Sequence, residues 1–275
     1  MARFHRQRNP SSWRRLAMGT WRDPDDPTVY GVLEVDVTRA LAYIAALREA
    51  TGVHATLTHV VGKAAAVAIR ERPEVNGIVR RGRHVYLRDS IDVFFQVAFE
   101  GGEDLSGAKI ANADRKSVVE IANELAAKAE AVREHRDREI LKTQNLLRML
   151  PDWLRGRALG LTSWLTYDVG LDLRAVGIPF DAFGSVMVTN VGSFGLPLGL
   201  APLVPFSHTP ALLTLGAVQE RPWVVGGAVV PRPVLAIGAT FDHRVLDGFQ
   251  AGKLTARFVE ILDDPASILG DPHAG

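Results

Sequence analysis

Alternating apolar and polar positions predict several β-strands along this chain. Leu33, Val35 and Val37 alternate with polar neighbours at positions 34, 36 and 38, which is the two-residue period of a half-exposed strand. Apolar runs bounded by turn residues predict further strands at residues 85–87, 93–99, 185–189, 212–216, 223–230 and 234–241.

Apolar residues at helical spacing predict four helices among these strands. The first ends near Gly52, and the second begins with Thr58 as its cap and ends before Pro73. The third takes Asp114 as its N-cap, and its charged continuation through Glu139 extends it toward Pro151. The last helix follows the final strand and carries an apolar face formed by Leu254, Phe258, Ile261 and Leu262. Because helices and strands mix without strict alternation, the expected fold class is α/β or α+β with a mixed sheet.

Composition narrows the classes of function. The 275 residues are 47% hydrophobic and 23% charged, which is typical of a globular protein with a sizeable core, and no repeat or low-complexity linker divides them. We therefore expect one domain over residues 1–275. The 32 basic and 31 acidic side chains leave a net charge of +1, so nucleic acid is not an expected partner. The absence of cysteine excludes disulfides, thiolate metal sites and thiol nucleophiles.

Two segments bear on targeting and membranes. Residues 1–26 form a basic N-terminal arm, whose first 22 residues hold six arginines and no acid; we interpret it as a solvated arm rather than an organelle transit segment. Residues 182–219 carry no Asp, Glu, Lys or Arg, which is long enough to cross a bilayer, but glycines and prolines interrupt them repeatedly. They predict a buried strand and a turn-rich loop that forms a candidate channel wall. A membrane partner is not expected, and the predicted location is cytoplasmic.

The segment Phe241–Gly248 joins the last predicted strand to the last helix and contains the first candidate site. A histidine on such a turn titrates near neutral pH and suits a general base, which here is His243. Asp247 follows four residues later, and Gly248 permits a tight backbone. The alternative is structural: Asp247 caps the helix, and His243 is a satisfied polar residue at a strand end.

The second candidate segment is a short strand flanked by glycines, Gly184–Gly195. Thr189 and Asn190 offer a hydroxyl and an amide where the strand opens, and Gly192 and Ser193 follow in the turn. Taken alone, the segment is better explained as an ordinary strand followed by a turn. No metal motif is present, because His54 and His59 lack a carboxylate partner at ligand spacing, and P-loop, Gly-x-Gly-x-x-Gly and Gly-x-Ser-x-Gly motifs are absent.

Together and in this order, the two segments resemble the catalytic domain of the dihydrolipoamide acyltransferase component of 2-oxo acid dehydrogenase complexes, a family related to chloramphenicol acetyltransferase. His243, Arg244, Asp247 and Gly248 match its His-Arg-x-x-Asp-Gly motif, and Thr189-Asn190 matches its strand ending in Ser-Asn or Thr-Asn. The resemblance covers nearly the whole chain. It implies a chloramphenicol acetyltransferase-like two-layer sandwich with a mixed sheet, here with an extra helical insertion at about residues 130–180.

The resemblance also implies a chemistry. It would be acyl transfer between a lipoamide-type thioester and coenzyme A as substrate, without a metal. His243 would take the thiol proton, Thr189 would stabilise the oxyanion, and Asp247 would hold the loop through an N-terminal arginine such as Arg14 or Arg15. The substrate channel would be lined by Asn190, Gly192, Ser193, Arg244 and Gly248.

Implied partners are copies of the same chain. In this family the site lies between subunits of a trimer, with His243 of one chain facing Thr189 of the next, and trimers build larger cores. Lipoyl and partner-binding domains are not expected within these residues, so a separate lipoyl-carrier protein would supply lipoamide. Two alternatives stay open: a non-catalytic scaffold or shell protein of the same fold, and a coenzyme A-dependent transferase acting on a small molecule.

Overall fold

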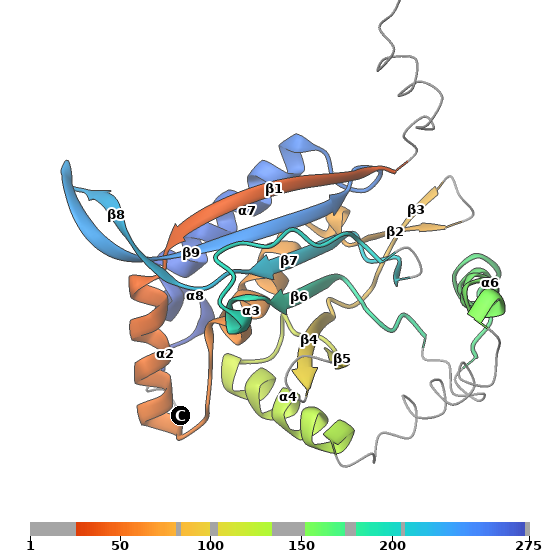
Figure 1. The fold of residues 1–275 in the computed structure, drawn as a ribbon, viewed down its shortest axis with the longest axis horizontal. Helices are drawn as coiled ribbons and strands as arrows, with labels where there is room; N and C mark the ends of the chain where they lie inside the picture. The colour runs from red at the N-terminus through yellow and green to blue at the C-terminus, as the bar shows by residue number, and fades with distance from the viewer. Residues whose placement is uncertain are drawn as a thin grey trace, which may run out of the picture.

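The computed structural model describes residues 26–80, 84–99, 104–133, 152–173, 180–204 and 207–272. Within these ranges a seven-stranded mixed sheet runs in the order β1-β9-β7-β6-β4-β5, with β8 paired to the first half of β9 (Figure 1). β2 and β3 form a separate antiparallel pair. The strands are β1 (Thr28–Asp36), β2 (Gly77–Arg80), β3 (His84–Leu87), β4 (Val93–Phe99), β5 (Asp104–Ile110), β6 (Val186–Asn190), β7 (Ala211–Leu215), β8 (Gln219–Val225) and β9 (Ala228–Asp242).

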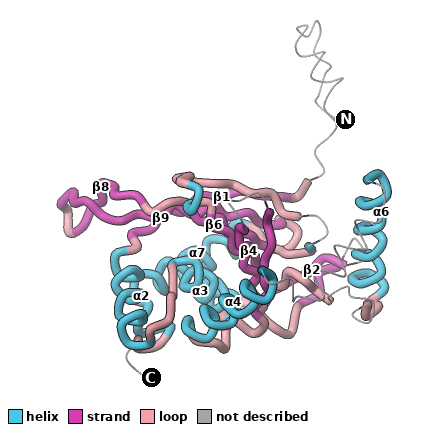
Figure 2. Tube along the Cα trace, turned by 60° about the horizontal axis from the view of Figure 1, so that its bottom comes forward, coloured by secondary structure: helices cyan, strands magenta, loops and turns pink. Residues whose placement is uncertain are grey.

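Helices cover one face of this sheet and make the second layer (Figure 2). The two-layer mixed architecture expected from the sequence is thus confirmed. None of the described helices is long and apolar enough to cross a membrane. The helices are α2 (Thr38–Thr51), α3 (Leu57–Arg70), α4 (Val118–Arg133), α7 (Gly248–Asp263) and α8 (Pro265–Leu269) on the covered face, α6 (Asp152–Ser163) apart from it, and the short turns η1 (Pro73–Val75), η3 (Trp164–Val169) and η5 (Gly192–Phe194).

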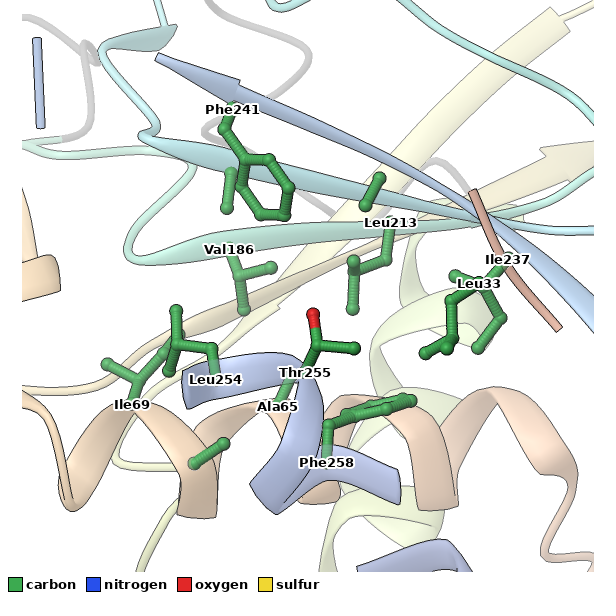
Figure 3. A pocket seen from close by; sticks show the side chains of 13 residues that line it. Leu33, Ala65, Ile69, Val186, Leu213, Ile237, Phe241, Leu254, Thr255 and Phe258 are labelled. Atoms are coloured by element: carbon green, nitrogen blue, oxygen red, sulfur yellow. The ribbon is translucent and has the colours of Figure 1, made fainter. Parts of the chain in front are cut away.

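Alternation along β9 decides which side chains enter the core. Ile237, Ala239 and Phe241 point toward α3 and α7, where they border a cavity of about 70 Å³ between the sheet and the two helices (Figure 3). The lining is almost wholly aliphatic and aromatic, with Thr255 the polar residue among it. This cavity is a packing gap in the core and holds no group for proton transfer.

A loop crosses the opposite, outer face of the sheet and depends on two glycines. A Cβ on Gly216 would lie 1.9 Å from the Pro197 carbonyl oxygen, and one on Gly238 would lie 2.0 Å from the Gly199 oxygen. Any side chain at either position would push this loop off the sheet. The Thr240 hydroxyl donates to the Ala201 carbonyl at 2.7 Å and holds the loop further along.

Three sequence expectations about local structure are wrong. Residues 223–230 are not one strand, because Gly226 and Gly227 both adopt positive φ and form the turn of the β8–β9 hairpin. The second helix is capped by Thr56 rather than Thr58. Asp114 is buried in a turn, and the cap of α4 is Ser117, whose hydroxyl accepts from the Glu120 backbone at 3.1 Å.

Part of the predicted insertion is described and is helical. α6 and η3 lie beyond the β2–β3 pair (Figure 1), and the Arg80 side chain donates to the Tyr167 carbonyl. A buried ion pair connects the end of this segment to the core. Arg88 donates through Nε to Asp181 Oδ2 at 2.7 Å and through Nη2 to Asp181 Oδ1 at 2.9 Å. The predicted continuation through Glu139 to residue 151 lies outside the described residues.

Candidate functional site

The turn that carries His243 is built around the buried carboxylate of Asp242. Asp242 Oδ1 accepts from the Arg244 backbone and side chain, both at 2.9 Å, and Arg244 Nη2 reaches Oδ2 at 2.7 Å. This hydrogen bonding and charge raise the pKa of Arg244. The His243 backbone donates to the Pro27 carbonyl at 2.9 Å, so the turn is also pinned to the start of β1. The His243 side chain is exposed on this fixed support.

Asp247 caps α7, which is the structural alternative considered for it. Its carboxylate accepts from the Gln250 backbone at 3.0 Å, and the Gln250 side chain accepts in return from the Asp247 backbone at 2.9 Å. Gly248 is the first residue of the helix. The loop-holding arginines expected for Asp247, Arg14 and Arg15, lie outside the described residues.

The second candidate segment lies at the end of β6. Asn190 points to the helical layer, where its side-chain amide donates to the Thr58 hydroxyl at the start of α3, at 3.1 Å. Ser193 closes the following turn by donating to the Asn190 carbonyl at 2.9 Å. Gly192 leaves no room for a side chain, because a Cβ there would lie 2.4 Å from the Gly216 oxygen. Thr189 alternates with Val188 and Asn190, so its hydroxyl lies on the outer face of the sheet.

Within one chain the structure keeps Thr189 and His243 apart. Thr189 pairs with Thr214 on the neighbouring strand β7, and Thr214 pairs with Gly238 on β9. Gly238 lies five residues before His243. Two strand spacings of about 4.8 Å and five residues at about 3.3 Å put the two residues roughly 19 Å from each other. A site that uses both side chains therefore needs two copies of the chain.

Sequence reasoning missed two groups near these segments. Asp242 organises the His243 turn, but in the sequence it cannot be distinguished from any other polar residue at the end of a strand. His59 is a second imidazole, half-buried, whose Nδ1 accepts from the Thr56 backbone at 3.0 Å. Burial, and then the charges of His54 and Arg48, lower the pKa of His59 to about 4, so it is a neutral structural cap at pH 7. A capping-box pattern with histidine at the third position was the available signal.

The described residues contain no group of three or more histidine, aspartate or glutamate side chains placed to hold a metal ion. The groups brought together around Thr189 and around His243 are instead a hydroxyl, an imidazole and backbone amides. Such groups suit proton transfer and the stabilisation of an oxyanion in acyl transfer.

Comparison with known proteins points the same way. The model of the 2-oxoacid dehydrogenases acyltransferase catalytic domain matches residues 24–139 and 182–270. A probable dihydrolipoyllysine-residue succinyltransferase component of the 2-oxoglutarate dehydrogenase complex from Schizosaccharomyces pombe is 28% identical over 224 residues, which cover 80% of this chain. The chain spans only 40% of that relative's length.

Two solved structures share the fold. A probable dihydrolipoamide acetyltransferase from Listeria monocytogenes 4b F2365 superposes with a TM-score of 0.64 at 21% identity, covering 97% of each chain. The cubic core of a pyruvate dehydrogenase multienzyme complex gives 0.63 at 22% identity, over 89% of this chain and 85% of that one. The family match omits residues 140–181, which contain α6 and η3, and the two candidate segments also lie outside this range.

Proposed function

Since the chain belongs to the 2-oxoacid dehydrogenase acyltransferase family, through its catalytic domain, we propose that it transfers an acyl group between a lipoamide-type thioester and coenzyme A. The observation that carries the mechanism is the separation of His243 and Thr189 within one chain, together with the outward direction of Thr189. Both favour a site in which one copy supplies the imidazole and its neighbour supplies the hydroxyl.

The outer face of the sheet supports an assembly of copies. Tyr30 and Val32 of β1 are 47% and 55% exposed there, and Leu198 and Leu200 of the crossing loop are 37% and 49% exposed. Apolar side chains gathered on one face are typical of a surface that meets another protein. A second and third copy of this chain would bury them and bring the outward Thr189 of one copy toward the His243 turn of the next, which makes a trimer the proposed unit.

The proposed reaction begins with the thiol of coenzyme A or dihydrolipoamide. A thiol with a pKa near 8.5 is only a few per cent thiolate at about pH 7, so a base increases its reactivity. His243 takes the thiol proton as sulfur bonds to the thioester carbonyl carbon, and the carbonyl electrons move to oxygen. The Thr189 hydroxyl donates to this oxyanion, a contact worth about 2–4 kcal/mol in the transition state. The original carbon–sulfur bond then breaks, and the histidinium returns its proton to the leaving thiolate.

The other residues of the two segments have supporting roles in this proposal. Asp242 and Arg244 hold the turn so that the imidazole needs no reorganisation, and Asp247 holds it from the side of α7. Asn190 ties the end of β6 to α3, and Gly192 and Ser193 shape the turn that follows Thr189. Arg244 and Gly248 would border the coenzyme A channel. A separate lipoyl-carrying protein is the proposed acyl donor.

The experiment measures thioester formation by the purified chain from acyl-coenzyme A and dihydrolipoamide. His243→Ala should lower kcat by three or more orders of magnitude, Thr189→Ala by about 100-fold, and Thr189→Ser only slightly, because serine retains the hydroxyl. Full activity of His243→Ala would reject His243 as the base. Well-formed oligomers of the unmodified chain that show no turnover with acetyl, succinyl or branched acyl donors would favour the scaffold alternative.

The shared site is tested by mixing the two inactive variants. If His243→Ala and Thr189→Ala chains are unfolded together and refolded into mixed trimers, about a quarter of the interfaces regain both side chains. Activity should then return to about that fraction of the unmodified level. The control is the Thr189→Ala chain alone, unfolded and refolded by the same procedure. No recovery in stable mixed trimers would mean that one chain must supply both groups, which contradicts the proposal.

A further inference from the structure

The hydroxyl of Thr214, in the middle of β7, is buried without a hydrogen-bond partner among the described residues. Thr214 as a whole residue is only 1% exposed. Buried hydroxyl groups nearly always have a partner, because water no longer supplies one, and an unpaired one costs stability. The position of Thr214 in the sheet indicates which group can become that partner.

Strand register places Thr214 directly beside Thr189, the proposed oxyanion donor. The two threonines are register partners on the neighbouring parallel strands β6 and β7 (Figure 1). Register partners on adjacent strands point to the same face of a sheet, so both side chains lie on its outer face. The strands are about 4.8 Å apart, and a staggered rotamer of Thr189 that turns its hydroxyl toward β7 brings the two oxygens within hydrogen-bond reach.

The other surroundings of Thr214 are apolar or closed. Its register partner on β9 is Gly238, which has no side chain. The loop that crosses the outer face covers Thr214, because a Cβ on Gly199 would lie 3.0 Å from the Thr214 methyl carbon and 3.0 Å from a methyl carbon of Val191. A neighbouring copy of the chain cannot reach a hydroxyl beneath this loop. Of the two positions that register puts beside Thr214, the one with a polar side chain is Thr189.

We propose that Thr214 is a positioning residue for Thr189, whose oxygen accepts a hydrogen bond from the Thr214 hydroxyl when substrate is bound. The inference rests on the proposed function, in which Thr189 stabilises the oxyanion. A threonine hydroxyl has one hydrogen to donate and two lone pairs that accept. When Thr214 occupies one lone pair of Thr189, the Thr189 hydrogen is directed away from β7 and is available to the substrate.

The difference in burial between the two residues makes this arrangement effective. Thr189 is half-buried and meets the substrate, whereas Thr214 lies behind it, out of reach of water. Water therefore offers the Thr214 hydroxyl no competing acceptor. Hydrogen bonds that form a chain in such a low-dielectric place strengthen one another, so the buried hydroxyl also makes Thr189 a better donor to the oxyanion.

The test compares Thr214→Val with the unmodified chain in acyl transfer from acyl-coenzyme A to dihydrolipoamide. Valine retains the shape and removes the hydroxyl, so kcat should fall about tenfold while KM stays unchanged, because Thr214 does not touch the substrate. The melting temperature should not fall, since the lost group is a buried hydroxyl without a partner. Thr166→Val is the matched control: Thr166 is 3% exposed, its hydroxyl is also unpaired among the described residues, and it lies in η3. Its kcat should equal that of the unmodified chain.

A double-mutant cycle distinguishes positioning from a separate contribution. In chains that already carry Thr189→Ala, Thr214→Val should cause no further loss of kcat, because the hydroxyl that Thr214 positions is gone. Thr214→Ser and Thr214→Ala differ from each other only by the hydroxyl. The serine variant should keep most of the activity and the alanine variant should lose about tenfold, which keeps the inference testable if Thr214→Val does not fold.

Unchanged kcat in folded Thr214→Val, or a further tenfold loss when it is added to Thr189→Ala, would overturn the inference and leave the proposed function in place. Equal kcat of the serine and alanine variants would do the same. Full activity of Thr189→Ala alone would reject the oxyanion role of Thr189, and this inference with it.

Discussion

Arg244 and Asp242 form a closed pair two residues apart, with the Arg244 guanidinium 2.7 Å from one oxygen of Asp242 and the Arg244 backbone 2.9 Å from the other. The residue between them is His243. Asp242 as a whole residue is only 8% exposed, whereas His243 beside it is exposed to solvent. The buried partner thus fixes the backbone from which the exposed imidazole projects.

Replacing Asp242 by Asn should weaken the turn without removing His243. The amide still accepts one hydrogen bond, but it loses the charge that holds the guanidinium, which should cost about 1 kcal/mol of stability. Because the His243 imidazole would be positioned less firmly, kcat should fall roughly tenfold with little change in KM. Thermal unfolding and steady-state kinetics measure the two effects. Asp89→Asn, at an exposed bend, should change neither.

The stability of the fold should fall in mild acid because of His59. Its pKa is about 4 in the folded chain and about 6.5 when unfolded, so the unfolded state binds more protons between these values. The free energy of unfolding therefore has its full value above pH 6.5. It decreases by about 2–3 kcal/mol as the pH falls to 4.

His59→Gln separates this titration from the helix cap. Glutamine at the third helical position retains the capping box with Thr56 but carries no proton in this range. Urea unfolding at pH 4, 5, 6 and 7 should therefore show a flatter profile for His59→Gln than for the unmodified chain. Identical slopes would place the acid sensitivity elsewhere.

Gly238 should tolerate no side chain, since the loop that crosses the outer face passes directly over it. A Cβ there would lie 2.0 Å from the Gly199 oxygen, so Gly238→Ala should lower stability by about 3 kcal/mol. Gly252→Ala is the opposite case: it lies in α7 with no atom within 4 Å of the added Cβ. It should stabilise the chain by about 0.5–1 kcal/mol, because alanine favours helix. Melting temperatures of the two variants should move in opposite directions.

The buried pair of Arg88 and Asp181 should matter more than surface pairs do. Their side chains are 7% and 15% exposed, so removing one charge leaves the other buried without its counter-ion. Asp181→Asn is the cleanest variant, because asparagine tolerates the positive φ of 48° at this position. It should cost about 3 kcal/mol.

Glu71→Gln provides the comparison for that pair. Glu71 pairs with Arg257 at 2.8 Å on the surface, and its loss should cost less than about 1 kcal/mol. Chemical denaturation of both variants gives the two values. Equal losses would mean that the Arg88–Asp181 pair does not anchor the segment that follows η3.

The elements predicted from periodicity agree closely with the structure where the signal is local. The strand around Leu33 and the helices before Gly52 and Pro73 are where alternation and helical spacing put them. The errors arise where a turn or a cap competes with the apolar run. Residues 223–230 are apolar enough for one strand, but two successive glycines with positive φ reverse the chain inside them. Ser117 rather than Asp114 caps α4, because the capping box with Glu120 fixes its first residue.

The sequence by itself determined the family, the order of its elements and the two segments that carry candidate chemistry, because motifs and periodicity are properties of neighbouring residues. Only the tertiary structure decided that Thr189 and His243 lie far apart on one sheet, that Asp242 supports the turn, and that η3 docks against Arg80 through the Tyr167 carbonyl. These relations depend on strand order, register and the docking of η3. Contacts between residues far apart in the chain set all three, and no local pattern encodes them.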